Sequence, residues 1–306
     1  MNKKRDLLCL TDISAEEIWN LILTTHEIKY GKLDVSAYLK GKTVGLIFQK
    51  PSTRTRISFE VAVARMGGKS IYANWTELQL ARGESIKDTA RVLSKYLDAV
   101  VMRVTSHSIL EEFAAYSDIP TINGLSDLCH PVQILSDLYT IYEKFGRLKG
   151  IKLAYVGDGN NIANSLLIGA SKVGMNISIA TPPKYRPNQL FIEKAYEFSS
   201  NSGARVEILD DPKEAVRNAD IVYTDTFVSM GYEMEREERL KVFLPKYQVN
   251  MDLINNTGKK SYFMHCLPAY RGQEVTDEVI DSGLSLVYVQ AENRLYMQQA
   301  ILKWLL

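Results

Sequence analysis

A run of hydroxyl and guanidinium side chains stands where a predicted strand gives way to a helix. Residues 52–56 read Ser-Thr-Arg-Thr-Arg, after the apolar stretch 43–48 and before the helix-like stretch 57–65. The first turn of a helix exposes backbone N–H groups at the positive end of the helix dipole, and arginine adds a planar fork that suits phosphate oxygens. These residue types indicate a phosphate clamp, although a helix cap with solvated arginines would use the same residues.

Polar residues also follow later predicted strands of the first half. Arg103 ends the apolar run 99–102, where it either supplies a second charge to one phosphate or simply marks a strand end at the surface. His130 precedes a proline at the start of a helix, and Gln133 shares that opening turn. A lone histidine is more often structural than catalytic. Here the imidazole could donate to a carbonyl oxygen while the glutamine recognises an amide.

Two motifs of the second half offer a carboxylate and a thiol. Asp225 begins the loop 225–231, where it could bind an ammonium group or simply initiate a turn. His265 and Cys266 are neighbours on a predicted strand, so we expect their side chains to face opposite ways. A shared thiolate–imidazole pair is therefore not expected, and a zinc site has too few candidate ligands. The better interpretation has Cys266 pointing into the site beside strand-end carbonyls.

The glycine-rich segment 157–161, Gly-Asp-Gly-Asn-Asn, resembles a dinucleotide-binding fingerprint only superficially. Ala163 and Asn164 stand where its third glycine would fall. The next predicted strand, 176–181, ends without the acidic residue that would bind a ribose. The sequence therefore argues against a nicotinamide-dependent dehydrogenase.

Short apolar runs alternate with helical stretches along the whole chain and must position these motifs. The candidate strands are 43–48, 70–74, 98–104, 120–124, 151–156, 176–181, 206–209, 221–224, 261–266 and 285–289. Their nearly continuous apolar character is typical of strands buried on both faces. The alternation predicts an α/β fold with two doubly wound parallel sheets and linking helices. Every motif follows a strand, so we expect a cleft between the two domains to collect them.

The predicted division falls in a long connecting helix that begins near His130. We expect one domain over 1–135, completed by a final helix over 291–306, and a second domain over 136–290. Ser14 and Glu17 form a capping box that predicts the first helix.

Composition narrows the class of protein. The chain has 306 residues, enough for two domains of about 150 each, and a net charge of +1, which does not favour nucleic-acid or membrane binding. Cys9, Cys129 and Cys266 are far apart and odd in number, so neither a disulfide framework nor a zinc ribbon is expected. Together with the lack of a long apolar run, they favour the cytoplasm.

Taken in order, the motifs at 52–56, 130–133 (His-Pro-x-Gln), 225–231 (Asp-x-x-x-Ser-Met-Gly) and 265–268 (His-Cys-Leu-Pro) resemble the transcarbamylase family. The last two are similar to ornithine-specific members, since aspartate-specific members typically have Pro-Leu-Pro at the last motif. The resemblance covers essentially the whole chain. It implies transfer of the carbamoyl group of carbamoyl phosphate to the δ-amine of L-ornithine, by a homotrimer that needs no metal or organic cofactor.

The resemblance also implies site residues in three groups. The catalytic group is Arg54, Arg103, His130, Asp225 and Cys266. The carbamoyl-phosphate group is Ser52, Thr53, Arg54, Thr55, Gln79, Arg103, His130, Gln133, Cys266, Leu267 and Arg294, in which Gln79 reaches a neighbouring subunit. The ornithine group is Asn161, Asp225, Ser229 and Met230.

Two departures from the family pattern remove no predicted ligand. Phe227 stands where tryptophan is usual, and Val132 replaces a more frequent small polar residue. A transcarbamylase for another amine, such as putrescine, and a non-catalytic binder with the same fold remain alternatives. The sequence leaves open whether such an enzyme serves arginine synthesis or the reverse direction, and whether trimers assemble further.

Overall fold

A computed structural model describes residues 4–229 and 231–306 and divides the chain into two compact units. The first unit runs up to Tyr139 and includes Asn293–Leu306, and the second is Thr140–Glu292. The division falls inside the helix Pro131–Phe145. Each unit is built around its own parallel sheet.

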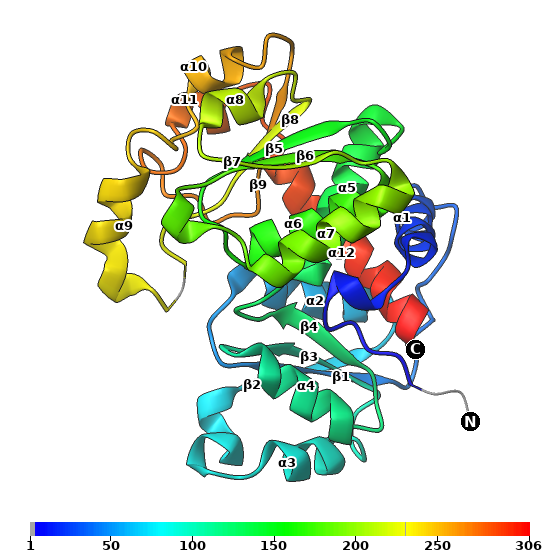
Figure 1. Ribbon diagram of the computed structural model, residues 1–306. Helices are drawn as coiled ribbons and strands as arrows, with labels where there is room; N and C mark the ends of the chain where they lie inside the picture. Colours follow the sequence, from blue (N-terminus) through cyan, green and yellow to red (C-terminus); the bar gives the residue numbers. More distant parts are fainter. Residues whose placement is uncertain (1–3, 230) are drawn as a thin grey trace. The chain divides into compact units, whose positions relative to one another are not determined.

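The first unit holds a four-stranded sheet in the order β2-β1-β3-β4 (Figure 1). Its strands are β1 (Thr43–Phe48), β2 (Lys69–Asn74), β3 (Ala99–Arg103) and β4 (Thr121–Leu125). All neighbours pair in parallel, and Val44 of β1 lies opposite Ser70 on one side and Ala99 on the other. The central strand β3 is buried along its whole length, as its continuous apolar run predicts.

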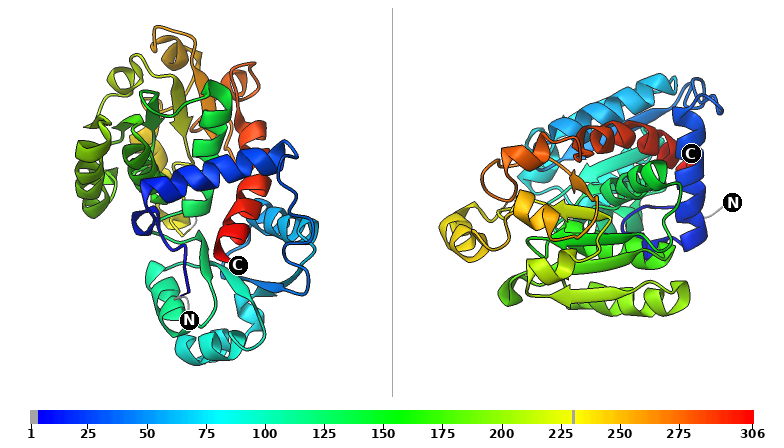
Figure 2. Two further views of the ribbon diagram at one scale, coloured as in Figure 1. Left: turned by 90° about the vertical axis from the view of Figure 1, so that its right-hand side faces the viewer. Right: turned by 90° about the horizontal axis from the view of Figure 1, so that it is seen from above.

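Helices cover both faces of this sheet, with α2 on one face and α3 and α4 on the other (Figure 1). The helices that belong to this unit or begin in it are α1 (Ala15–Lys29), α2 (Thr53–Arg65), α3 (Ile86–Leu93), α4 (His107–Tyr116) and α5 (Pro131–Phe145). The predicted capping box is confirmed, because Ser14 Oγ accepts from Glu17 N at 3.1 Å and Glu17 Oε2 accepts from Ser14 N at 2.8 Å. The last helix, α12 (Val287–Leu305), crosses α1 at a steep angle (Figure 2), and Lys29 Nζ donates to Asn293 Oδ1 at 2.8 Å.

The second unit holds a five-stranded parallel sheet in the order β7-β6-β5-β8-β9. Its strands are β5 (Lys152–Val156), β6 (Asn176–Ala180), β7 (Val206–Leu209), β8 (Ile221–Thr224) and β9 (Tyr262–His265). Its helices are α6 (Asn161–Val173), α7 (Gln189–Ser202), α8 (Pro212–Val216), α9 (Arg236–Phe243), α10 (Met251–Asn255) and α11 (Asp277–Ile280). Helices α6 and α7 cover one face, and α8 lies over the other (Figure 1). The fold is the predicted pair of doubly wound α/β sheets.

One predicted strand is wrong. Residues 285–289 form only an isolated bridge between Ser285 and Phe263, and helix α12 begins at Val287, four residues before the predicted start at 291. Tyr288 is 68% exposed and Val289 40% exposed, so the run is not buried on both faces as a central strand would be. Packing therefore overrides the β-branched composition here. Every other predicted strand matches an observed strand to within one residue at each end.

Strand order reverses direction once in each sheet, between β1 and β3 and between β5 and β8. In open parallel sheets, ligands bind beyond the carboxyl ends of the two strands at such a switch point. Residues 52–56 follow β1, and Asp225 follows β8, so each unit carries a predicted motif at its own switch point.

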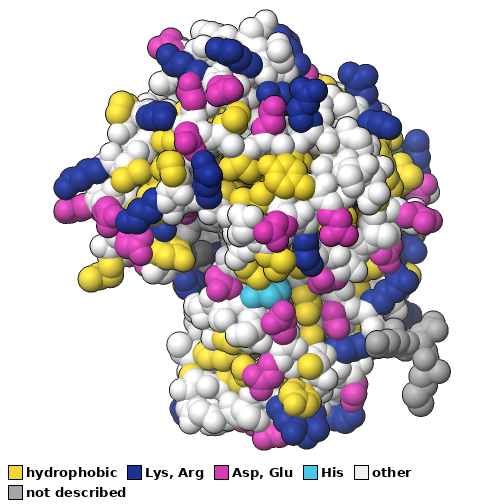
Figure 3. Space-filling view, in the orientation of Figure 1, with side chains coloured by type: hydrophobic (Ala, Val, Ile, Leu, Met, Phe, Trp, Pro, Cys, Tyr) yellow, Lys and Arg dark blue, Asp and Glu magenta, His cyan; other side chains and the backbone are white. Residues whose placement is uncertain are grey.

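On the face shown in Figure 3, basic and acidic side chains are interspersed, and neither kind forms a large patch. Within the described ranges, no helix combines the length and apolar character needed to cross a bilayer.

Candidate functional site

The residues after β1 both cap helix α2 and present its first turn. Ser52 has an extended backbone (φ −155°), and its Oγ accepts from Thr55 N at 3.3 Å. The helix-cap alternative is thus observed, and it does not exclude the phosphate clamp. Capping fixes the first turn, whose other N–H groups and half-buried Arg54 lie at the positive end of the helix dipole.

Beside this turn, α12 contributes a second arginine to the first unit. Arg294 Nη2 donates to Thr55 Oγ1 at 2.7 Å, although the two residues are 239 positions apart. Arg294 is 3% exposed, Thr55 1% and Arg103, at the end of β3, 6%. Two guanidiniums therefore lie largely out of water near one helix N-terminus, which makes the locality strongly attractive to an anion.

His130 lies at the start of α5 within the electrostatic reach of both arginines. Burial, followed by the positive charges of Arg294 and Arg103, holds the pKa of His130 well below its ordinary value. The imidazole is therefore neutral at pH 7, with one N–H to donate. A neutral imidazole near two cations suits an oxygen on which negative charge develops.

The neutrality of His130 predicts how stability changes with pH. Unfolded histidine takes up a proton near pH 6.5, whereas the folded site does not, so the unfolded state gains protons as the pH falls. The contribution of His130 to the free energy of unfolding is fully present above about pH 6.5. It is lost as the pH falls below that value, by at most about 1.4 kcal/mol per pH unit. Urea denaturation across this range should give a shallower pH slope for His130→Asn than for wild type, and equal slopes would contradict a neutral His130.

The amide of Gln133 is turned by Asp137, one helical turn further along α5. Gln133 Nε2 donates to Asp137 Oδ1 at 2.8 Å, and both side chains are buried. Because a carboxylate only accepts, the amide nitrogen must face Asp137 and Oε1 must face away. Gln133 Oε1 is buried and has no hydrogen-bond partner among the described residues. It is thus an acceptor set for an N–H donor.

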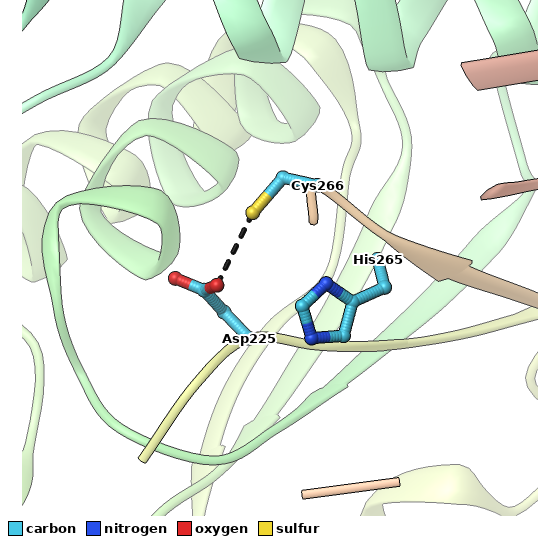
Figure 4. A group of neighbouring side chains, drawn as sticks. All are labelled: Asp225, His265 and Cys266. Atoms are coloured by element: carbon cyan, nitrogen blue, oxygen red, sulfur yellow. Dashed lines mark hydrogen bonds between the residues drawn. The ribbon is translucent and has the colours of Figure 1, made fainter. Parts of the chain in front are cut away.

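In the second unit, Asp225 lies between a thiol and an amide. Cys266 Sγ donates to Asp225 Oδ1 at 3.2 Å, and Figure 4 shows the thiol and the carboxylate pointing toward one another. Asn160 Nδ2 donates to Asp225 Oδ2 at 2.8 Å and lies 3.3 Å from Ser229 Oγ. The oxygen of the same amide caps α6 by accepting from Ile162 N at 3.0 Å. The side chain of Asn160 therefore caps α6 and at the same time holds the carboxylate of Asp225.

His265 and Cys266 do not face opposite ways, which corrects the expectation from strand alternation. Potential metal-ligating atoms of Asp225, His265 and Cys266 all lie within 4.8 Å of one another. Alternation fails because β9 ends at His265, and Leu267 has a left-handed backbone (φ +59°).

The imidazole of His265 is nevertheless engaged elsewhere. Leu267 N donates to its Nδ1 at 2.8 Å, so Nε2 carries the proton and donates to the buried Glu274 Oε1 at 3.2 Å. With both ring nitrogens in hydrogen bonds, His265 has no lone pair to offer a metal. Its contacts instead hold the backbone of Leu267 in place.

Comparison with known protein families accounts for nearly the whole chain. Residues 5–143 match the carbamoyl-phosphate-binding domain of aspartate/ornithine carbamoyltransferases, and residues 149–305 match the Asp/Orn-binding domain of the same family.

The chain belongs to the aspartate/ornithine carbamoyltransferase family. Curated relatives in this carbamoyltransferase family include the ornithine carbamoyltransferase of Pyrococcus abyssi, 52% identical over 99% of this chain and 96% of that protein. The anabolic ornithine carbamoyltransferase of Pyrococcus furiosus is 53% identical over 97% of this chain and 95% of its own length.

Solved structures of the carbamoyltransferase family share the fold. The ornithine carbamoyltransferase from Pyrococcus furiosus superposes with a TM-score of 0.94 at 53% identity, covering 98% of this chain and 96% of that one. The anabolic ornithine carbamoyltransferase from Campylobacter jejuni gives 0.93 at 40% identity, covering 98% of both chains.

The structure brings some predicted site residues together but not others. In the first unit, contacts or charges link Thr55, Arg103, His130 and Arg294. Thr53 and Gln79 are exposed, and among the described residues Gln79 makes no hydrogen bond or ion pair with that group. Asn161 begins α6 half-buried, and Met230 lies outside the described residues.

Asn160 is a residue of the site in the second unit that sequence reasoning missed. The predicted ligand was its neighbour Asn161, yet Asn160 is the residue that holds Asp225. Asparagine is a preferred N-cap, so its place before the helix after β5 was the available signal. That signal explains the cap but not the second hydrogen bond, which depends on a residue 65 positions away.

Proposed function

We propose that the chain transfers the carbamoyl group of carbamoyl phosphate to the δ-amine of L-ornithine, giving L-citrulline and phosphate. The observation that carries the proposal is the buried group of Arg103, Arg294, Thr55 and neutral His130 at the switch point of the first sheet. The names of the relatives, ornithine carbamoyltransferase, supply the acceptor.

The phosphate of the donor is proposed to lie at the start of α2. Ser52, Thr53, Arg54 and Thr55 would supply hydroxyl, backbone and guanidinium donors, and Arg103 a second charge. Two arginines and a helix N-terminus provide the positive charge that phosphate requires, so we propose no metal or organic cofactor.

The carbamoyl group has a carbonyl oxygen that accepts hydrogen bonds and an NH2 group that donates them, and the site is proposed to offer partners for both. Thr55, Arg103 and His130 would donate to the carbonyl oxygen, with Arg294 beside them. Preorganised donors at that oxygen stabilise the tetrahedral intermediate by about 3 kcal/mol each. The carbamoyl NH2 would donate to Gln133 Oε1, whose orientation Asp137 fixes, and to the carbonyls of Cys266 and Leu267.

The acceptor is proposed to bind through Asn161, Asp225, Ser229 and Met230. An alkyl ammonium has a pKa of about 10.4, so roughly one in a few thousand is neutral at pH 7, and the site must produce the neutral amine. Asp225, already hydrogen-bonded to Cys266 Sγ, would orient the amine and help to remove its proton. The neutral amine then attacks the carbamoyl carbon, and phosphate leaves with its charge held by Arg54.

Replacing the thiol tests this acceptor half. Cys266→Ala removes a donor to Asp225 and a group beside the reacting amine, so we expect kcat to fall by about tenfold to about 100-fold, the range for one proton-transfer partner. The KM for carbamoyl phosphate should stay within about twofold, because the phosphate residues are untouched. Steady-state kinetics over the pH range would show this, and an unchanged kcat at every pH would remove Cys266 from the mechanism.

The charge around Asp225 supports an acceptor with an amine rather than a second side-chain carboxylate. The buried cation beside this loop, Arg239, is already paired with Asp158 at 2.9 Å and with Glu235 at 3.0 Å. A carboxylate of an aspartate-like acceptor would have to compete with both partners.

We further propose a homotrimer in the cytoplasm. Exposed apolar side chains on the first unit, Ile57 (53%), Val61 (36%) and Ile71 (55%), lie on α2 and on the edge strand β2. An interface would cover such side chains. The exposed Gln79 follows the edge strand β2 in the chain, and in a trimer it would reach the site of a neighbouring subunit. The three cysteines form no disulfide, which suits a reducing compartment.

Product analysis tests the proposed reaction. Purified protein with carbamoyl phosphate and L-ornithine, in the presence of a chelator, should yield citrulline and phosphate in equal amounts. Phosphate release without citrulline would indicate a hydrolase instead, and loss of activity on chelation would show that a metal is required.

A further inference from the structure

We propose that Arg239 is a positioning residue that holds together the two loops on which the acceptor binds. The proposal rests on the proposed function, because it concerns the site around Asp225. Arg239 lies on α9 and is 5% exposed, yet none of the motifs that define the site includes it.

The guanidinium bridges the loop after β5 and the loop after β8. Arg239 Nη1 donates to Asp158 Oδ2 at 2.9 Å and to the carbonyl oxygen of Phe227 at 3.3 Å. Asp158 is two residues before Asn160, and Phe227 is two residues after Asp225. One side chain therefore sets the separation of the two segments that carry the acceptor carboxylate and its amide partner.

Aromatic packing fixes the guanidinium between these loops. Its Cζ lies 4.7 Å from the ring centroid of Tyr185 and 4.5 Å from that of Tyr232. Phe227 stacks on Phe243, also on α9, with ring centroids 4.7 Å apart and planes 12° apart. The loop after β8 is thus held to α9 by both its ring and its carbonyl.

The loop after β5 has little room to adjust if the bridge is lost. A Cβ on Gly159 would lie 2.2 Å from Pro187 N and 2.4 Å from Tyr185 O, so the backbone passes directly against its neighbour. The Tyr155 hydroxyl also donates to the carbonyl oxygen of Asp158 at 2.8 Å. Because this loop is tightly packed, loss of Arg239 should displace the loop after β8, which carries Asp225 and Ser229.

Kinetics of single variants separate positioning from general stability. Arg239→Met should raise the KM for L-ornithine by about tenfold or more, the effect of one lost charge-assisted hydrogen bond, and leave the KM for carbamoyl phosphate within about twofold. Arg239→Lys keeps the charge and should recover part of the loss. Arg236→Met on the same helix replaces an exposed arginine and serves as the matched control, with both constants unchanged.

A double variant keeps the proposal testable if Arg239→Met is poorly folded. Asp158→Asn/Arg239→Met leaves no buried unpaired charge, so its thermal stability should exceed that of Arg239→Met alone. The donor to the Phe227 carbonyl is still absent, so the KM for L-ornithine should stay raised. A double variant with wild-type KM would show that Arg239 only neutralises Asp158 and would overturn the proposal. Raised constants for both substrates in equal measure would overturn it as well.

The same measurements keep this inference distinct from the proposed function. Wild-type protein and the Arg236→Met control must form citrulline for the KM comparison to be made. If neither forms citrulline, the proposed reaction fails. If both form it and Arg239→Met has an unchanged KM for L-ornithine, the reaction stands and only the positioning role of Arg239 is lost.

Discussion

Replacing Arg103 by glutamine is expected to lower kcat/KM for carbamoyl phosphate by about 1000-fold, or about 4 kcal/mol of transition-state stabilisation. Arg103 is 6% exposed, so its charge acts with little screening by water. It is proposed to serve two groups at once, the phosphate of the donor and the oxygen that becomes negative in the tetrahedral intermediate. Glutamine keeps one hydrogen-bond donor but carries no charge, so both interactions weaken together.

Arg91→Gln, on helix α3, is the matched control for this variant, because it removes an exposed arginine of the same unit. Its kinetics should match those of wild type. Steady-state assays with carbamoyl phosphate varied, together with circular dichroism of each variant, give the comparison. A folded Arg103→Gln protein with kcat/KM within about tenfold of wild type would contradict the role given to this arginine.

The second large effect is expected at Asp225. Asp225→Asn keeps the shape of the side chain and an oxygen that can accept from Asn160 or from Cys266, whose bonds to the carboxylate are 2.8 and 3.2 Å long. It removes the negative charge that attracts the ammonium form of ornithine and helps to take its proton. We expect kcat/KM for L-ornithine to fall by about 100-fold to about 1000-fold.

The carbamoyl-phosphate half should be unaffected by Asp225→Asn. Direct binding of carbamoyl phosphate, measured by calorimetry, should stay within about twofold of wild type. Asp252→Asn, an exposed aspartate on α10, is the matched control. Equal losses for both substrates would mean that Asp225 supports the fold rather than the acceptor.

The positions of the strands could be predicted from sequence because parallel strands buried on both faces leave continuous apolar runs. The failure at 285–289 marks the limit of that signal. Leu286 N still donates to the carbonyl oxygen of Phe263 on β9 at 2.9 Å, but Leu286 O accepts from Gln290 N at 2.8 Å and the chain continues as α12. Val287 is buried, whereas Tyr288 and Val289 are exposed. A local run of β-branched residues cannot reveal which neighbour the fold will supply.

The motif residues could be found because each follows a strand, but their partners could not. Arg294 donates to Thr55 across 239 residues, and Arg239 pairs with Asp158 across 81. Neither pair has a local spacing that a sequence would reveal, and Arg294 was predicted only through resemblance to a family. By contrast, Gln133 and Asp137 are four residues apart on one helix, the spacing at which side chains on a helix meet.

The chemistry of single side chains also depends on features that sequence does not carry. The pKa of Asp158 is raised to about 7 by burial, against the opposing charge of Arg239. The orientation of Cys266 depends on the end of β9 and on the left-handed backbone of Leu267. The alternation of side chains along a strand therefore predicted the wrong relative orientation of His265 and Cys266. Burial and chain direction at a strand end are properties of the folded molecule.

The identity of the acceptor is decided by its selectivity among amines. With carbamoyl phosphate held at a saturating concentration, kcat/KM should be measured for L-ornithine, putrescine and L-aspartate in parallel. We expect citrulline formation with L-ornithine at a kcat/KM at least about 100-fold above that of either alternative, the discrimination that a few well-placed polar contacts provide. Faster carbamoylation of putrescine or of aspartate would contradict it.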